Sequence, residues 1–345
     1  MGRASRARRV ATAAAFGGTG LGAIGAAAAG LMYGESKLAR RRIAPAETNP
    51  PTADGLWTAP GVQSKRDKLV FAMLGDSSAA GYGVHRDAET PAARIAVGLS
   101  ALSRRPVELV NVAEVGAQSS ALLEQAERVL PRKPALAVVM VGANDVTHLV
   151  RASDSVRHLS AAIELLRENN IEVVVGTCPD LGTIRPIAQP LRWMVRRLSR
   201  TLAAAQTMAV VGAGGRAVSL GDILGPEFAT ERHYFSEDQF HPSATGYARA
   251  ADVLLPSAAA ALGLVTVARP AGPFTSDKAR PIARAAARAA SRPGTEVVGT
   301  SVDGVATGRH GRWARLTRRR AGDVITPTPE AAVHDQPATM SDTDR

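Results

Sequence analysis

Short apolar runs that alternate with amphipathic segments constrain the fold of this chain more than any other feature of its sequence. The four clearest runs cover residues 68–74, 107–112, 135–141 and 171–176, and a weaker fifth run covers 217–220. The runs are rich in β-branched residues, which is typical of strands buried on both faces of a parallel sheet. A parallel sheet in turn requires a long connection between neighbouring strands.

The segments between these runs have the residue spacing of helices. Thr90 and Pro91 form an N-cap and first-turn pair that opens a predicted helix ending near residue 102. The other predicted helices cover 119–130, 153–169, 189–211 and 243–262. This alternation predicts an α/β fold, a three-layer α/β/α sandwich around a central parallel sheet of about five strands. Successive right-handed crossovers give the sheet a flavodoxin-like strand order.

The N-terminal residues 1–42 have the pattern of a targeting segment with basic flanks. Four arginines lie within residues 1–9, and no charged residue follows until after residue 34. The uncharged stretch is long enough to span a bilayer, although most of it is alanine and glycine. Three interpretations remain open: a signal anchor, a signal peptide cut near residues 27–29, and a soluble leader. The first two predict an extracytoplasmic protein, anchored to the membrane by this segment or secreted to the cell envelope.

The remaining chain divides by composition. Residues 43–66 are rich in proline, alanine and threonine and are predicted to be a linker. The folded domain is predicted to cover 67–265. Residues 266–345 are basic and have little apolar periodicity, which predicts a largely disordered tail. Glycines and alternating valines within 296–316 allow a small hairpin in that tail.

Arginine dominates the charge of the chain. The formal net charge is +11, with 37 arginines against 5 lysines. Arginine-favouring codons explain this excess, and so does attraction to an anionic surface such as lipid headgroups. The basic residues are not interleaved with aromatic ones and no nucleic-acid motif is present, so a nucleic-acid partner is not expected. The single cysteine, Cys178, excludes an intrachain disulfide and is predicted to be a small buried apolar residue.

Polar side chains gather at one edge of the predicted sheet. In open α/β sheets, reactive groups lie outside the carboxyl ends of the strands. Four separate segments place polar or small residues there: Asp76, Ser77 and Ser78 after the first strand, Asn111 and Gly116 after the second, Gly142, Asn144 and Asp145 after the third, and Asp238 and His241 before the last helix.

These residue types match the needs of acyl transfer. A serine hydroxyl is a poor nucleophile until a base, usually histidine, takes its proton, and a carboxylate holds that histidine in the correct tautomer. Hydrogen-bond donors must also face the developing oxyanion. Ser77, His241 and Asp238 supply the first three groups, and Gly116 and Asn144 supply donors.

The same residues also suit purely structural roles. Ser77 and Asp238 also suit helix caps, His241 a surface position, Asn144 a turn, and Gly116 a backbone conformation with positive φ. Asp76 and Asp145 are predicted to brace loops through hydrogen bonds. The remaining histidines lack the spacing of metal ligands, so neither a metal nor another cofactor is predicted. The GAGG stretch at 212–215 follows a helix rather than a strand, which excludes a dinucleotide loop.

Four short motifs in sequence order resemble a known family. They are GDSS at 75–78, NVAEVG at 111–116, GAND at 142–145 and DQFHP at 238–242. Together they resemble the four blocks of the SGNH (GDSL-type) hydrolases over about residues 68–263, with both ends of the chain left out. One departure is Ser78, where many members have leucine, and it places a second hydroxyl beside Ser77.

The resemblance implies a role for each matching position. Ser77 would be the nucleophile, and its own N–H would face the oxyanion together with the N–H of Gly116 and the side-chain amide of Asn144. His241 would act as general base and then as general acid, oriented by Asp238. Asp76, Gly142 and Asp145 would support these residues.

The sequence therefore predicts a serine esterase of the cell envelope that acts on acyl esters, from short acyl groups to lipids or acetylated glycans. An acyltransferase with the same site is the first alternative, because a sugar hydroxyl can replace water as the acceptor. A non-catalytic anchored module that binds acylated ligands or acidic polymers is the second alternative.

Overall fold

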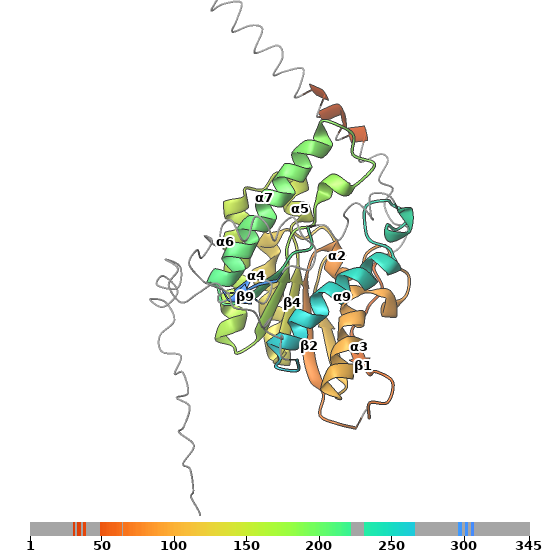
Figure 1. The fold of residues 1–345 in the computed structure, drawn as a ribbon, viewed down its shortest axis with the longest axis vertical. Helices are drawn as coiled ribbons and strands as arrows, with labels where there is room; N and C mark the ends of the chain where they lie inside the picture. The colour runs from red at the N-terminus through yellow and green to blue at the C-terminus, as the bar shows by residue number, and fades with distance from the viewer. Residues whose placement is uncertain are drawn as a thin grey trace, which may run out of the picture.

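The computed structural model describes residues 30–31, 33–35, 37–38, 49–63, 65–221, 231–265, 296–298, 301–302 and 305–306. Its body is a twisted sheet with helices packed on both faces (Figure 1). This is the three-layer α/β/α sandwich that the alternating pattern predicts.

The centre of the sheet is parallel and contains five strands. They are β2 (Leu69–Gly75), β3 (Val107–Asn111), β4 (Leu136–Met140), β5 (Glu172–Gly176) and β6 (Arg216–Val218). Their spatial order is β3-β2-β4-β5-β6, and every neighbouring pair is parallel. The predicted flavodoxin-like order is confirmed. Strand β3 lies on one side of β2, and β4, β5 and β6 then follow in turn on the other side.

The helices divide between the two faces of the sheet. Helices α3 (Pro91–Ser103) and α9 (Ala244–Ala261) pack on one face, and α4 (Leu122–Val129), α6 (Ala152–Glu168) and α7 (Leu191–Gly212) pack on the other. Two short helices, α2 (Ser77–Ala80) and α5 (Ala143–Thr147), follow β2 and β4 directly. Single 3₁₀ turns lie at η1 (Asp87–Glu89), η2 (Ser119–Ala121), η3 (Leu130–Arg132), η4 (Leu181–Thr183) and η5 (Arg232–Tyr234).

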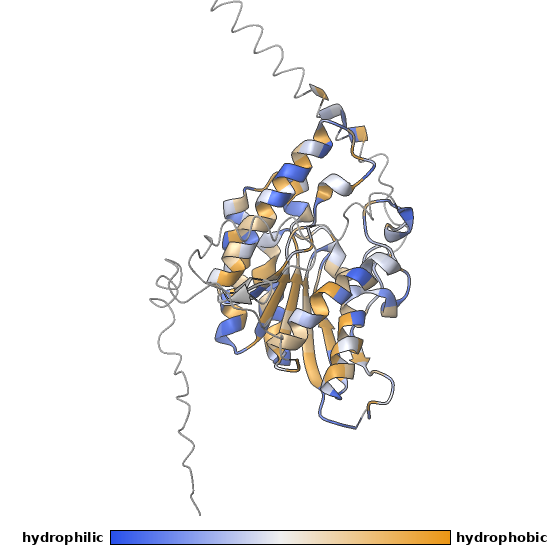
Figure 2. Ribbon diagram, viewed as in Figure 1, coloured by the Kyte–Doolittle hydropathy of each residue, from blue (hydrophilic) through white to orange (hydrophobic). Residues whose placement is uncertain are grey.

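Alternation along β2 explains how one strand serves both halves of the core. Phe71 and Met73 belong to the apolar cluster under α3 and α9, whereas Ala72 and Leu74 belong to the cluster under α4 and α6. Successive side chains of a strand point to opposite faces, so a strand covered on both sides must be apolar throughout. The apolar colouring of the central strands and the polar outer surfaces of the helices follow this rule (Figure 2).

The predicted linker contains a strand. Residues Gly55–Trp57 form β1, which pairs with β3 in the antiparallel direction. The indole N–H of Trp57 donates to the carbonyl of Ala53 at 2.8 Å, and the amide of Ala59 donates to the Ser100 hydroxyl at 3.0 Å. Three residues are too few to show a strand period, and the flanking prolines are typical of a linker, so the sequence does not indicate this strand.

The two ends of the chain are described only in part. Three short strands, β7 (Glu296–Val298), β8 (Ser301–Val302) and β9 (Val305–Ala306), continue the sheet beyond β6 in antiparallel order. They lie inside the range where a hairpin is predicted, and the remainder of the predicted tail lies outside the described residues. The predicted signal or anchor segment also lies largely outside them. Among the helices that are described, none is long and apolar enough to cross a membrane.

Candidate active site

A hydrogen-bonded chain of three side chains lies at the carboxyl edge of the sheet. The Ser77 hydroxyl is 2.8 Å from Nε2 of His241, and Nδ1 of His241 is 2.6 Å from Oδ2 of Asp238. Ser77 and Asp238 are buried, and the His241 side chain is 12% exposed. Since one imidazole nitrogen faces the hydroxyl and the other faces a carboxylate, the ring can take a proton from Ser77 while Asp238 stabilises the resulting cation.

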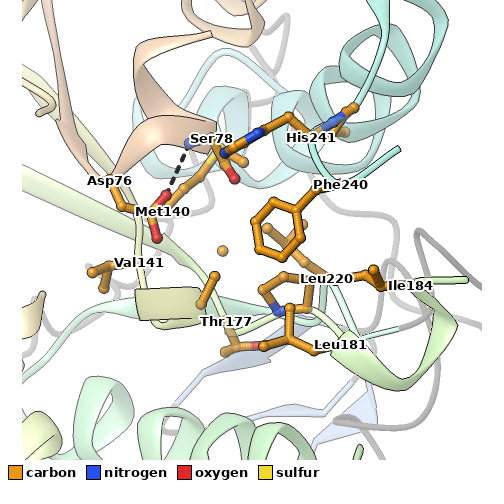
Figure 3. Close-up of a pocket in the computed structure, with 15 residues that line it drawn as sticks. Asp76, Ser78, Met140, Val141, Thr177, Leu181, Ile184, Leu220, Phe240 and His241 are labelled. Atoms are coloured by element: carbon orange, nitrogen blue, oxygen red, sulfur yellow. Dashed lines mark hydrogen bonds between the residues drawn. The ribbon is translucent and has the colours of Figure 1, made fainter. Parts of the chain in front are cut away.

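A sharp turn from β2 into α2 positions Ser77. The strand ends at Gly75 with φ of 134°, and α2 begins at Ser77. The carboxylate of Asp76 caps this helix by accepting the N–H of Ser78 at 2.9 Å (Figure 3). The turn therefore fixes the serine at the start of a helix, with its hydroxyl at the edge of the sheet.

The loop before α9 holds His241 by its backbone as well as by its ring. Oδ1 of Asp238 accepts the N–H groups of Phe240 and His241 at 2.8 and 2.9 Å and the Ser236 hydroxyl at 2.6 Å. The rings of Tyr82 and Phe240 pack edge-on against the imidazole, with centroid distances of 4.6 and 4.9 Å. These contacts leave the imidazole little freedom to turn away from Ser77.

The environment of Asp238 favours its ionised form. Burial alone would raise the pKa of this carboxyl, but the hydrogen bond and charge of His241 and the donors Ser236 and Phe240 outweigh burial and lower the pKa. A carboxylate that stays ionised can orient and stabilise the imidazolium throughout a reaction cycle.

Two of the three predicted oxyanion donors, Gly116 and Asn144, lie on segments that are joined by hydrogen bonds. Gly116 is exposed in a turn with φ of 85°, and this turn is anchored to β2 because the amide of Glu114 donates to the carbonyl of Gly75 at 3.1 Å. One N–H of the Asn144 side chain donates to the carbonyl of Ala117 at 3.0 Å. An amide nitrogen carries two hydrogens, so Asn144 keeps a second donor for an oxyanion.

Asp145 and Gly142 support the segments that carry Asn144 and Gly116. Asp145 is fully buried and accepts the amide and hydroxyl of Ser119 at 3.2 Å each, which joins α5 to the end of the Gly116 loop. Gly142 has φ of 133°, and a side chain there would approach Cβ of Cys178 to 2.8 Å. Both residues therefore support the site by packing and hydrogen bonding, as the sequence predicts for Asp145.

Asp76 is the most perturbed acid of the site. Burial raises the pKa of Asp76 from its ordinary value of 3.8 to about 6, against the opposing effect of the backbone donor Ser78 and the charge of His241. The pKa of Asp76 is higher in the folded than in the unfolded chain, so the contribution of Asp76 to stability falls as pH rises from about 4 to about 6.

Asp76→Asn is expected to stabilise the protein at pH 7–8 by up to about 3 kcal/mol, since the amide oxygen can still accept the N–H of Ser78 without a buried charge. The gain should vanish below pH 4, where Asp76 is neutral in both states. Urea unfolding between pH 4 and 8 measures it. Asp238→Asn is the matched control with the opposite sign, because the lowered pKa of Asp238 stabilises the fold at neutral pH. A constant difference between Asp76→Asn and wild type over this range would contradict the expectation.

Two buried glutamines position the strand ends and were not predicted. Gln125 accepts the amide of Gly75 at 2.7 Å and donates to its carbonyl at 3.0 Å. Gln206 accepts the amide of Cys178 at 2.7 Å and donates to the carbonyl of Val141 at 3.1 Å. Each side-chain amide pairs with backbone groups where the sheet ladder stops, which satisfies buried polar groups beside the site. A single glutamine in a helical pattern carries no sequence signal for this role.

Cys178 is buried, as predicted, and burial raises the pKa of its thiol well above the ordinary value. Within the ranges that the structure describes, no group of three or more His, Cys, Asp or Glu side chains is arranged to hold a metal ion.

Comparison with known proteins identifies the family. Residues 73–249 match the model of the GDSL-like lipase/acylhydrolase family. The chain is also 41% identical over 254 residues to the GDSL-like esterase Rv1075c of Mycobacterium tuberculosis, a match that covers 71% of this chain and 80% of that protein. The chain therefore belongs to the GDSL-like lipase/acylhydrolase family, which confirms the resemblance to SGNH (GDSL-type) hydrolases and supports ester hydrolysis as its reaction.

Solved structures similar to this chain include TesA and an acetyl xylan esterase. TesA has a TM-score of 0.43 and 19% identity, covering 57% of this chain and 99% of its own. A variant of Axe2, an acetyl xylan esterase from Geobacillus stearothermophilus, has a TM-score of 0.43 and 18% identity, covering 60% of this chain and 99% of its own.

Proposed function

We propose that the protein is a serine esterase that cleaves carboxylic esters through an acyl-enzyme on Ser77. The observation that carries the proposal is the hydrogen-bonded chain from Ser77 through His241 to the buried carboxylate of Asp238. Family membership supports the reaction type, and this geometry supports the roles of the three residues.

In the proposed first half-reaction, Nε2 of His241 takes the proton of Ser77 while Oγ attacks the carbonyl carbon of the ester. The tetrahedral intermediate collapses when His241 passes that proton to the departing alcohol, which leaves the acyl group on Ser77. A water molecule then gives a proton to His241 as its oxygen attacks the acyl carbon. The second tetrahedral intermediate collapses when its bond to Oγ of Ser77 breaks, His241 returns the proton to Oγ, and the carboxylic acid leaves. Asp238 holds the imidazole and balances its charge in both halves.

The oxyanion of each tetrahedral intermediate needs donors that are already in place. In the proposed arrangement these are the N–H groups of Ser77 and Gly116 and the free N–H of Asn144. Loss of one donor of this kind typically costs about 3–4 kcal/mol of transition-state stabilisation. The bond from Asn144 to the carbonyl of Ala117 supports this role, because it fixes the amide plane.

The proposed location is extracytoplasmic, at the cell envelope, with the N-terminal segment as signal or anchor. It rests on the four arginines within residues 3–9 and the uncharged stretch 10–34. Digestion by an added protease in intact cells, compared with lysed cells, checks it, and protection in intact cells would contradict it.

Covalent labelling tests the proposed activity directly. The purified full chain should hydrolyse p-nitrophenyl butyrate, and an organofluorophosphonate should abolish that activity while adding one label per chain. Peptide mapping should place the label on Ser77 rather than on the neighbouring Ser78. A chain that neither hydrolyses the ester nor takes the label would contradict the proposal. A label on Ser78 would show that Ser78, and not Ser77, is the nucleophile.

A further inference from the structure

Helix α7 carries an unbalanced positive charge. It contains four arginines and no acid over its 22 residues, whereas α3, α4, α6 and α9 each have a net charge between −1 and +1. A general excess of arginine codons would raise the charge of every helix, so it does not explain why the charge gathers on this one. The exposed face of α7 forms an open groove lined by Trp193, Arg196, Arg197 and Arg200 and, farther along the helix, by Ala204 and Met208.

The arginines of this face present their charge to solvent. Arg196 and Arg200 share the fully buried carboxylate of Asp180, but their own side chains are 47% and 41% exposed. Arg197 is exposed and has no carboxylate partner within the described part of the chain, and its guanidinium lies over the ring of Trp193, 5.8 Å from the centroid. Trp193 is itself exposed. An exposed indole beside guanidinium groups suits the boundary between lipid headgroups and acyl chains.

Exposed apolar side chains are concentrated where α7 begins. The described residues between 30 and 38 lie at this end of the helix, because the carboxylate of Glu35 accepts the N–H of Leu191, the first residue of α7, at 3.0 Å (Figure 1). Ten large apolar or aromatic side chains are exposed in the ranges that the structure describes, and four of them lie at these two places: Leu31, Tyr33, Leu38 and Trp193.

The sequence and the charge indicate what covers this surface. The uncharged stretch 10–34, which is long enough to enter a bilayer, runs directly into the residues that contact the start of α7. An anionic bilayer supplies phosphate groups for the arginines and an interfacial layer for the aromatic rings. A second copy of the same face would instead bring arginine against arginine.

We propose that the N-terminal half of α7 is a docking surface for an anionic lipid bilayer, where Arg196, Arg197 and Arg200 bind lipid phosphates and Trp193 lies at the level of the headgroups. This contact is peripheral and requires no membrane-spanning helix. The inference goes beyond the proposed esterase activity and does not depend on it.

Vesicle binding by the full chain tests this surface. Vesicles of phosphatidylcholine alone are compared with vesicles in which about one third of the lipid is phosphatidylglycerol, and the wild type should prefer the latter. The arginines within residues 3–9 also attract anionic vesicles, so substitutions on α7 carry the assignment. Arg197→Gln should weaken binding to the anionic vesicles by about fivefold, the usual contribution of one basic side chain near a charged bilayer. Trp193→Gln should also weaken it, and neither change touches the arginines that hold Asp180.

Matched controls lie on the opposite side of the sheet. Arg249→Gln removes the same charge from α9, and Leu102→Gln removes an exposed apolar side chain from α3. Both controls should bind the anionic vesicles as tightly as the wild type. All four variants change exposed side chains, so their unfolding temperatures should stay close to wild type.

Brominated phosphatidylcholine locates the indole in the bound state. At saturating anionic vesicles, the brominated lipid should quench the tryptophan fluorescence of the wild type. Trp193→Phe should lose most of this quenching while it remains bound. Because quenching requires proximity to the lipid, this result stands even where residues 3–9 supply most of the affinity.

Three results would overturn the inference and leave the esterase proposal intact. The first is equal binding of the anionic vesicles by Arg197→Gln and Arg249→Gln. The second is quenching that survives Trp193→Phe. The third is binding of poly-L-glutamate that requires Arg197 without a matching loss on vesicles, which would assign the face to acidic polymers rather than to lipid.

Discussion

Ser77→Ala will lower kcat for p-nitrophenyl butyrate by about 10⁴- to 10⁶-fold, while the far-UV circular dichroism and the unfolding temperature stay close to wild type. The expected size follows from serine hydrolases in general, where removal of the nucleophile leaves only the rate supplied by oxyanion donors and binding. The side chain removed is small, and its hydroxyl is hydrogen-bonded to the His241 ring at 2.8 Å. Steady-state kinetics on matched preparations provide the measurement.

Ser78→Ala is the control that distinguishes loss of the nucleophile from loss of a neighbouring hydroxyl. Ser78 carries the neighbouring hydroxyl, and its backbone N–H, which binds Asp76 at 2.9 Å, is kept by alanine. The loss in kcat should stay below about tenfold, since at most one ordinary hydrogen bond disappears. If instead Ser78→Ala removed the activity and Ser77→Ala retained it, the assignment of the nucleophile would be wrong.

Most of the fold was predictable because its signals are local. Each strand of the parallel sheet is a short apolar run, and the capping pair Thr90 and Pro91 marks the start of α3 as the structure has it. The candidate site was predictable for a related reason. Its residues follow the strands at their carboxyl ends, and the topology of a parallel sheet brings those ends to one edge.

The features that were missed depend on contacts between distant segments. Strand β1 is defined by its pairing with β3, not by any pattern of its own three residues. The roles of Gln125 and Gln206 exist only because α4 and α7 pack where the sheet ladder ends. Thr177 follows β5 as an ordinary turn residue would, and only the packing around it shows that its hydroxyl is enclosed without a partner.

Gly75, the first residue of the GDSS motif, shows how tightly this edge of the sheet is built. A methyl group at this position would overlap the carbonyl oxygen of Met140 and approach Cβ of Ala79 to 3.0 Å. That carbonyl already accepts the amide of Asp76 at 3.0 Å, and the Gln125 side chain bonds both backbone groups of Gly75. The strands cannot move apart to admit the methyl group without breaking these bonds.

Gly75→Ala is therefore expected to lower the free energy of unfolding by more than about 4 kcal/mol, a size reached when strain and lost hydrogen bonds coincide. For a domain of this size the unfolding temperature should fall by about 10 °C or more. Gly61→Ala is the matched control, because Gly61 also has positive φ, 78°, but a methyl group there meets nothing within 4 Å. It should cost only about 1–2 kcal/mol, the ordinary penalty for a left-handed residue. Equal losses in the two variants, measured by calorimetry, would mean that the backbone angle alone accounts for the glycine and that β2 and β4 can separate at the site.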